Sequence, residues 1–556
     1  MPQKMLWGKA PLLSVRQAFP SCGQVRTADP SVLRLYHRAL SYTDRPETWE
    51  GAFQLACLVL DHPEESPVCS LIRNALADTG NGSLEGAPGE QIARARAALR
   101  LFEYTTDRSI LRRLAFWFRY LEIDWEAFTC FGAPVYAPAD LMELLIRYYR
   151  ITGLKAILRL CVRLRSTAFD WATALNTLHQ VVPLRFEASN PLAFTENTRP
   201  ADLSFDEQQM LLNHGAMLAD GIRYSFCSGL YSGNGQELGA GLHALSFLLE
   251  HHRAVCGGFT ASPFLKGTAA SAPVDTEALS ALTEALTCMA AHRDAYPAAM
   301  DELVRIVMNG LYFCLQQEDL PAHQRVNTVS PERVPPADAA AYARFARAVA
   351  EAYHHAVGMT DQGLCINYLL PQQSALHAEG RRILFRCDGQ TAVFRFADAE
   401  EIHAEVFRAS VDTSRLALRR GERDFLLTDD LNPGSGRLLR LSQPLHDGDR
   451  LQILPGDGFL TESAHHQGLI CWRHNRLQCL PLSGSDYAFA SVSFSADQEG
   501  AVSARICPVS GWRLRNGEPE DVPVLPRASG EEQCLSLADY AQTGAKISLF
   551  PRCRLP

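Results

Sequence analysis

The sequence predicts an α+β multidomain protein in which an (α/α) helical toroid barrel is followed by antiparallel β-sandwich structure. Between residues 30 and 360, apolar residues recur at the spacing i, i+3, i+4, i+7 that is typical of amphipathic helices. After Gly363 they form short runs, several of them alternating, separated by turn-forming residues. We therefore divide the chain into an N-terminal arm at 1–29, a candidate for pairing with the β domain, a toroid at 30–363, a β-sandwich at 364–486 and a C-terminal β segment at 487–556.

The helical half repeats one unit, which consists of a helix, a tight polar turn and a second helix. The turn Thr105-Thr106-Asp107 suits a helix end followed by a new N-cap. A helix pair this short cannot bury its apolar face alone, so the copies must pack against one another. Irregular turn spacing and long insertions favour a closed toroid over an open superhelix. The other turns lie at 61–63, 150–153, 232–235 and 292–294, and the insertions at 186–205 and 257–274.

The strand half is marked by short runs with period-two alternation. Their alternating arginines indicate the solvent-facing side of antiparallel strands. Asp388-Gly389 and Asp447-Gly448 are expected turns between strands. The runs lie at 382–386, 391–396, 404–408, 415–419 and 437–441.

Composition excludes several classes of protein. The 556 residues include 53 Lys+Arg and 62 Asp+Glu, a net charge of −9, which gives no reason to expect nucleic acid or an anionic membrane as partner. No run of 18 apolar residues predicts a membrane span. The 16 cysteines are scattered, and the first residues lack the apolar run of a signal peptide. We therefore expect a cytoplasmic protein.

Short strings spread over most of the chain occur in an order shared with a known family. That order resembles glycoside hydrolase family 127, the β-L-arabinofuranosidase-like group, and the resemblance implies a helical toroid followed by β-sandwich domains. The strings are PLLSVR at 11–16, LLIRYYRITG at 144–153, NHG at 213–215, LYSG at 230–233, CGGF at 256–259, GLCINYLLP at 363–371 and HDGDRL at 446–451.

The resemblance also implies a site, which this sequence matches only in part. In the family, a general acid/base Glu lies in a Glu-x-Cys string after the Gly-Gly loop, and Glu277 is the matching residue, with Leu279 at the Cys position. The family's zinc-bound cysteine nucleophile has no counterpart, since the nearest stretch, 329–333, contains no cysteine. Val304 stands where the family has a metal-ligand Glu. We therefore expect no zinc and no other cofactor.

Glycoside hydrolysis by carboxylates needs a proton donor and a second carboxylate across the substrate. Glu284 shares a helix face with Glu277, but seven residues separate them by about 10 Å along the axis. That is too far for a retaining pair, at about 5 Å, and marginal for an inverting pair, at about 6.5–9.5 Å. Carboxylates on other helices are better partners: Asp140, Glu143, Asp220 and Glu332.

The catalytic candidates are therefore Glu277 and Glu332, and the candidates for substrate contact are His214, Asp140, Glu143, Glu284 and Tyr148. Each has a structural alternative. The charge of Glu277 favours the helix dipole in a first turn, and Asp140 suits an N-cap. His214 can be a structural histidine and Tyr148 a core aromatic, while Glu284 can be a solvated residue or a partner at the edge of the core.

The leading hypothesis is a glycoside hydrolase of the family 127 type, acting on a plant- or microbial-type glycan. The rival is a catalytically inactive carbohydrate-binding protein on the same fold, which the missing cysteines favour. A helical scaffold for protein partners is a third alternative. An oligosaccharide or glycoside is the expected partner, and a homodimer is one option. The sugar, the linkage and the stereochemical outcome stay open.

Overall fold

The structure is a computed structural model of the chain. It describes residues 25–77, 84–129, 138–178, 203, 205–262, 264–267, 272–290, 296–324, 336–360, 363–378, 381–396, 401–427, 436–454, 459–464, 468–479, 489–496, 502–510, 514–515, 518–519, 527–528 and 533–539.

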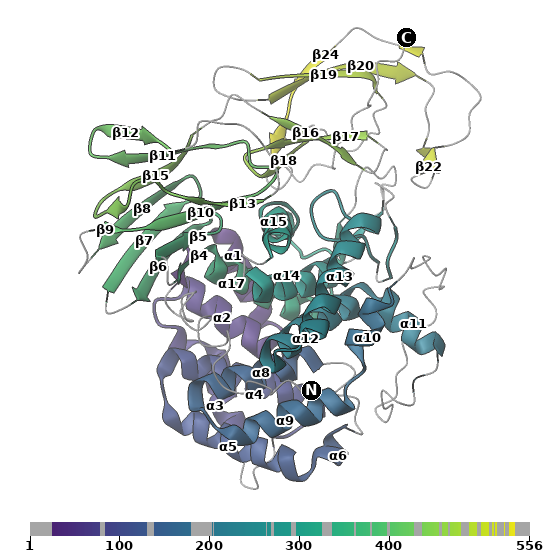
Figure 1. Ribbon diagram of the computed structural model, residues 1–556, viewed down its shortest axis with the longest axis vertical. Helices are drawn as coiled ribbons and strands as arrows, with labels where there is room; N and C mark the ends of the chain where they lie inside the picture. Colours follow the sequence, from purple (N-terminus) through teal and green to yellow (C-terminus); the bar gives the residue numbers. More distant parts are fainter. Residues whose placement is uncertain are drawn as a thin grey trace, which may run out of the picture.

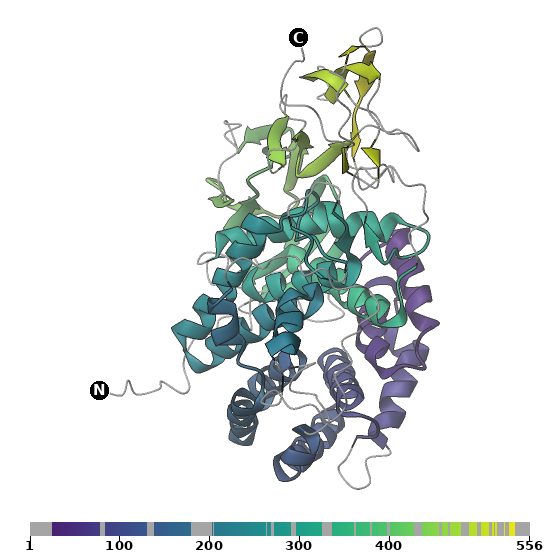
Figure 2. The same cartoon turned by 90° about the vertical axis from the view of Figure 1, so that its right-hand side faces the viewer.

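Six inner helices form a closed ring in the described helical half (Figures 1 and 2). Each packs against the next in chain order, and the last packs against the first. The predicted toroid is therefore confirmed. The inner helices are α2 (Trp49–Val59), α4 (Pro88–Thr105), α8 (Pro138–Thr152), α12 (Gly215–Ser232), α14 (Thr276–Ala290) and α17 (Ala339–Ala356).

Outer helices alternate with the inner ones along the chain and pack on them. Because of this alternation, the inner helices all begin at the same end of the barrel. The outer helices are α1 (Pro30–Leu40), α3 (Pro67–Ala77), α5 (Arg108–Ile123), α9 (Lys155–Thr167), α13 (Gly235–His251) and α15 (Pro297–Arg305). Shorter helices are α6 (Trp125–Thr129), α10 (Trp171–Asn176), α11 (Phe205–Asn213) and α16 (Tyr312–Gln316), with a π-helical turn at Ile306–Leu311.

The turn between α4 and α5 confirms the predicted helix boundary. Thr106 adopts a left-handed conformation with φ 57°, and its N–H donates to the carbonyl of Phe102. Asp107 accepts a 2.8 Å hydrogen bond from the backbone N–H of Ser109, as an N-cap residue does. None of the helices among the described residues is long and apolar enough to cross a membrane.

Two sheets follow the barrel and share one hydrophobic core with it. The larger has the order β1 (Val25–Arg26), β6 (Pro371–Ala378), β7 (Arg381–Asp388), β8 (Thr391–Phe396), β15 (Arg450–Leu454), β11 (Arg415–Arg420) and β12 (Arg423–Leu426). The smaller has the order β13 (Arg437–Arg440), β10 (Ala404–Arg408), β5 (Gly363–Ile366) and β4 (Val357–Thr360).

The pairing in these sheets follows the predicted pattern with one exception. In β7, Ile383 and Phe385 are buried while Arg382 and Arg386 are exposed, as the alternation predicted. β1 pairs antiparallel with β6, which joins residues 25–26 of the N-terminal arm to the larger sheet. The exception is β5 with β10, a parallel pair in a sandwich expected to be antiparallel.

The remaining strands lie toward the C-terminus or are short. β18 pairs with β25, so the chain returns from the C-terminal segment to the strands that precede it. The C-terminal strands are β16 (Leu460–Ala464), β17 (Gly468–Arg473), β18 (Arg476–Cys479), β19 (Phe489–Ala496), β20 (Val502–Ser510), β23 (Arg527–Ala528), β24 (Gln533–Ser536) and β25 (Ala538–Asp539). The short pairs are β2 (Val274–Asp275) with β3 (His323–Gln324), β9 (Glu401–Ile402) with β14 (Leu445–His446), and β21 (Leu514–Arg515) with β22 (Glu518–Pro519).

The end of α15 ties the barrel to the strand half. Arg305 Nη1 lies 2.8 Å from Glu462 Oε2, and its guanidinium stacks 5.1 Å from the ring centroid of Trp472. Asn309 donates through its amide nitrogen to the carbonyl of Asn475 and accepts from the backbone N–H of Leu477. The barrel and the strands are therefore held by buried, directed polar contacts as well as by apolar packing.

A glycine in α12 gives a test of how tightly the barrel is packed. A Cβ added at Gly221 would lie 2.2 Å from Cε3 of Trp171, so Gly221→Ala should lower the free energy of unfolding by about 1–3 kcal/mol. Gly239 in α13 is the control, because no atom lies within 4 Å of a Cβ added there. Gly239→Ala should raise the free energy of unfolding by about 0.5–1 kcal/mol. Urea unfolding of both variants checks this, and equal midpoints would contradict it.

Candidate functional site

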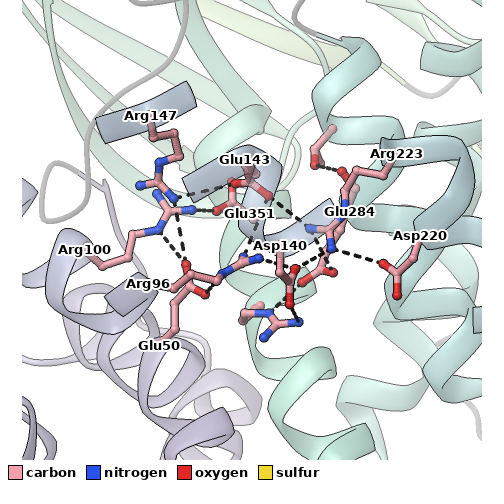
Figure 3. A network of polar contacts seen from close by, with 12 residues as sticks. Glu50, Arg96, Arg100, Asp140, Glu143, Arg147, Asp220, Arg223, Glu284 and Glu351 are labelled. Carbon is pink, nitrogen blue, oxygen red and sulfur yellow. Dashed lines mark hydrogen bonds and ion pairs between the residues drawn. The ribbon is translucent and has the colours of Figure 1, made fainter. Parts of the chain in front are cut away.

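The interior of the barrel is filled by ionic side chains, which we call the barrel network (Figure 3). Every inner helix contributes at least one member. The carboxylates are Glu50, Glu103, Asp140, Glu143, Asp220, Glu284 and Glu351, and the guanidinium groups are Arg96, Arg100, Arg147, Arg223, Arg344 and Arg347.

Arg223 of α12 is the most connected cation of the network. Its Nη1 lies 3.0 Å from Glu143 Oε2, and its Nη2 lies 3.1 Å from Asp220 Oδ1 and also binds Asp140. Only 1% of its side chain is exposed. On the next pair of helices, Arg347 Nε donates to Glu284 Oε1 at 2.8 Å.

The arginines hold the deep carboxylates in their ionised form. Burial raises the pKa of Glu50, but the charges of Arg96 and Arg100 outweigh it and lower that pKa to about 2. Burial also opposes ionisation of Asp140, and Arg96 and Arg223 together bring its pKa well below the ordinary value. Glu50 and Asp140 are therefore ionised and remain in ion pairs with these arginines.

Three residues predicted to contact substrate belong to this network. Asp140, Glu143 and Glu284 each bind at least one arginine. Asp140 is the third residue of α8, inside the helix, so the alternative that it is the N-cap is wrong. The structure brings these three carboxylates together around Arg223, which lies within 3.5 Å of Glu284 Oε2.

Tyr148 is not brought to this group. Tyr148 is 1% exposed, its hydroxyl donates to the carbonyl of Leu111 at 2.9 Å, and its ring centroid lies 4.7 Å from that of Phe118. It therefore packs between α5 and α8, as the core alternative supposed. Glu332 lies outside the described residues.

A second group, the rim cluster, lies where the inner helices begin, and consists of His214, Asp275 and Glu277. His214 directly precedes α12, while Glu277 is the second residue of α14. A Cβ at Gly215 would lie 2.8 Å from Cβ of Ala261 and 2.9 Å from Cβ of Ala278. The glycine thus allows the first turns of α12 and α14 to touch, which places His214 and Glu277 at the same end of the barrel.

Burial governs the protonation of this cluster. It raises the pKa of Glu277, an effect that the charge of Arg344 opposes and that of Asp220 reinforces. Burial also raises the pKa of Asp275 to about 6, against the hydrogen bond that its carboxylate accepts from Ala278 N–H. The rim carboxyls therefore keep their protons to higher pH than solvent-exposed carboxyls do, in contrast to Glu50 and Asp140 of the barrel network.

His214 is a neutral imidazole in the same surroundings. Burial, and then the charge of Arg344, lower its pKa to about 4. Its ring stands edge-on to Phe264, with centroids 5.7 Å apart. Its Nδ1 is buried and has no hydrogen-bond partner within the described part of the chain. A bound polar group could supply that partner.

The resemblance aligns Leu279 with a Cys of the family and Val304 with a metal-ligand Glu. Leu279 packs against Gly258 of the preceding loop and Gly310 of the π-helical turn, 3.3 Å from a Cβ built at either glycine. Val304 is 1% exposed in α15. Neither side chain carries a donor atom for a metal. In the ranges that the structure describes, no group of three or more His, Cys, Asp or Glu side chains could hold a metal ion.

Sequence reasoning missed the arginines and Asp275. Arg344 and Arg347 lie in an alanine-rich helix, where arginines three residues apart resemble a solvated face. The one available signal was that the six inner helices carry acidic and basic residues at positions that a closed ring turns inward. Asp275 precedes Glu277 by two residues and was given no role.

The fold is similar to that of solved glycoside hydrolases. One, titled a glycoside hydrolase, has a TM-score of 0.66 at 10% identity over 98% of this chain and 99% of that one. A GH127 beta-arabinofuranosidase has a TM-score of 0.61 at 10% identity, over 96% and 98% of the two chains. A GH127 beta-L-arabinofuranosidase from Geobacillus stearothermophilus T6 has a TM-score of 0.60 at 15% identity, over 92% and 91%.

No family model matches the sequence, and no curated protein matches it. At 10–15% identity, the likeness to these structures shows the shared fold, a helical barrel followed by β-sandwich structure. Function has to be argued from the site that the fold carries.

Glu50 gives a test of the barrel network. Its pKa, about 2 when folded against an ordinary 4.5, corresponds to about 3 kcal/mol of stability. Because the folded pKa is the lower one, this contribution is present above pH 4.5 and is lost as the pH falls toward 2. Glu50→Gln should therefore be less stable by about 3 kcal/mol at pH 7 and lose less stability on acidification.

Urea unfolding between pH 7 and pH 3 checks this expectation. Glu90→Gln, at a partly exposed position on α4, is the control and should change stability by less than about 0.5 kcal/mol. An acid dependence in Glu50→Gln that equals that of the wild type would show that Glu50 is not held ionised by the network.

Proposed function

We propose that the chain is a glycoside hydrolase and that the carboxyl of Glu277 is its general acid. The observation that carries this proposal is a buried carboxyl with a raised pKa at the rim of a helical barrel. A general acid must keep its proton at the working pH, and burial is a common means of raising a carboxyl pKa for that purpose. The titles of the structural neighbours support the same class of reaction.

In the proposed reaction, Glu277 donates its proton to the glycosidic oxygen while the bond between that oxygen and the anomeric carbon breaks. The leaving group departs as an alcohol. The oxygen of a water molecule bonds to the anomeric carbon, and one proton of that water restores the acid form of the protein. The net reaction consumes one water for each bond cleaved.

The second catalytic carboxylate is proposed to be Glu332. The carboxylates of Asp140, Glu143 and Glu284 are paired with arginines, which limits their freedom to move. We therefore assign these three carboxylates a structural role, as partners of the arginines in the barrel network beneath the rim. This leaves the substrate-contacting role to His214, whose buried Nδ1 suits a hydrogen bond with a sugar hydroxyl.

The proposed machinery uses no metal. Because Leu279 and Val304 stand where the family has Cys and a metal-ligand Glu, we assign the proton transfer to carboxyl groups of the chain itself. The proposed substrate is a plant- or microbial-type glycan, and arabinofuranosides are the first compounds to test. We also propose a cytoplasmic protein whose partner is the glycan substrate and not a membrane or nucleic acid, with a homodimer as one option for its assembly.

A panel of nitrophenyl furanosides and pyranosides tests the proposal. Wild type should release nitrophenol from at least one of them, and Glu277→Gln should lower kcat by about 10²–10⁴-fold, because glutamine cannot donate the proton. Glu90→Gln should retain the wild-type rate. Saturable sugar binding by wild type and Glu277→Gln, with turnover by neither, would overturn the enzyme proposal in favour of an inactive carbohydrate-binding protein.

A further inference from the structure

Two neighbouring inner helices carry charges that are paired differently at two depths of the barrel. Helix α14 has Glu277 at the rim and Glu284 seven residues deeper, while α17 has Arg344 and Arg347. At the deeper level, Arg347 Nε donates to Glu284 Oε1 at 2.8 Å. At the upper level, Arg344 Nη1 donates instead to Asp220 Oδ2 of α12, also at 2.8 Å.

Asp220 is held firmly as the acceptor for Arg344. Its other oxygen, Oδ1, lies 3.1 Å from Nη2 of Arg223, which is one turn further along α12. The side chains of Asp220, Arg223 and Arg344 are 10%, 1% and 15% exposed. Each carboxylate oxygen of Asp220 therefore binds a different arginine in surroundings that are largely shielded from water.

We propose that Asp220 is a positioning residue for Glu277: by holding the Arg344 guanidinium in an ion pair, it keeps this cation from pairing with the Glu277 carboxyl. Its catalytic meaning rests on the proposed function, in which Glu277 must carry a proton. The geometric claim concerns the ion pair itself and can be tested without a substrate.

The charged groups that act on Glu277 within the described residues come from three places. Arg344 and Arg347 of α17 favour its ionised form, while Asp220 of α12 and Asp338, the N-cap of α17, favour its protonated form. Asp275, two residues before it, interacts with it as well. The Arg344–Asp220 pair is the one opposed pair among them that is joined by a hydrogen bond.

The two members of that pair should shift the titration of Glu277 in opposite directions. Asp220→Asn removes a negative charge and releases Arg344, and both changes favour ionised Glu277, so its pKa falls. Arg344→Met removes the cation and leaves Asp220 with Arg223, so the pKa rises. Because Glu277 acts as an acid, the alkaline limb of the rate profile should move by about one pH unit, downward in Asp220→Asn and upward in Arg344→Met.

The experiment measures pH–rate profiles with the best nitrophenyl glycoside and, in parallel, the infrared titration of Glu277 as the difference between each protein and its Glu277→Gln counterpart. Asp220→Glu should restore the wild-type limb. Glu351→Gln is the matched control, since it removes a buried network carboxylate while Arg100 keeps Glu50 and Glu103 as partners. The pKa of Glu277 in this control should equal the wild-type value.

Opposite shifts in the two variants support the proposal, and a purely structural role of Asp220 would not produce them. Unchanged titration, or shifts in the same direction, would overturn it. If no glycoside is cleaved, the proposed function fails, but the infrared titration still decides the role of Asp220. If Asp220→Asn does not fold, Arg344→Met and the charge-preserving Arg344→Lys remain, and equal pKa values for Glu277 in these two would overturn the proposal.

Discussion

The structure depends on charge balance inside a closed ring of helices. Transferring a guanidinium or a carboxylate from water to a protein interior costs several kcal/mol, so each buried charge needs partners of opposite sign. Here those partners come from other helices: Glu50 of α2 binds Arg96 and Arg100 of α4, while Arg223 of α12 binds carboxylates of α8. We infer that these pairs fix the register of the inner helices, because a shift of one helix along its axis would leave a buried charge without a partner of opposite sign.

The same balance explains why the rim differs from the interior. The deep carboxylates are surrounded by arginines, which lower the pKa of Glu50 and Asp140 despite burial. At the rim, Arg344 is bound to Asp220, and the effect of burial on Glu277 prevails. One barrel thus contains ionised carboxylates that stabilise it and a carboxyl suited to hold a proton, and the difference lies in which acid each arginine binds.

Much of the fold could be predicted from the sequence because local patterns of capping residues and hydrophobic spacing determine it. Short-range rules of capping and periodicity explain three of these features. They are the turn at Thr105–Asp107, the alternation around Phe385 and the change from helical to strand-like spacing of apolar residues after Gly363. The parallel pairing of β5 with β10 could not be predicted in this way, since it joins strands that are distant in sequence and alternation does not record strand direction.

The site was predictable only in part. Glu277 was singled out by its place in a motif, but periodicity could not distinguish an arginine facing solvent from one facing the barrel axis. Arg344 and Arg347 find their ion-pair partners only in the closed ring, where they bind carboxylates of α12 and α14. Asp140 suited an N-cap in the sequence, yet it lies inside α8, where Arg96 and Arg223 bind it.

The most direct test of this account is a crystal structure of Glu277→Gln with an intact glycoside bound. We expect the glycosidic oxygen to lie within hydrogen-bond distance of the side chain at position 277, with the ion pairs of Asp220, Arg223 and Arg344 unbroken beneath the sugar. A glycoside bound away from the first turn of α14, or one that displaces the arginines from their carboxylates, would contradict the account.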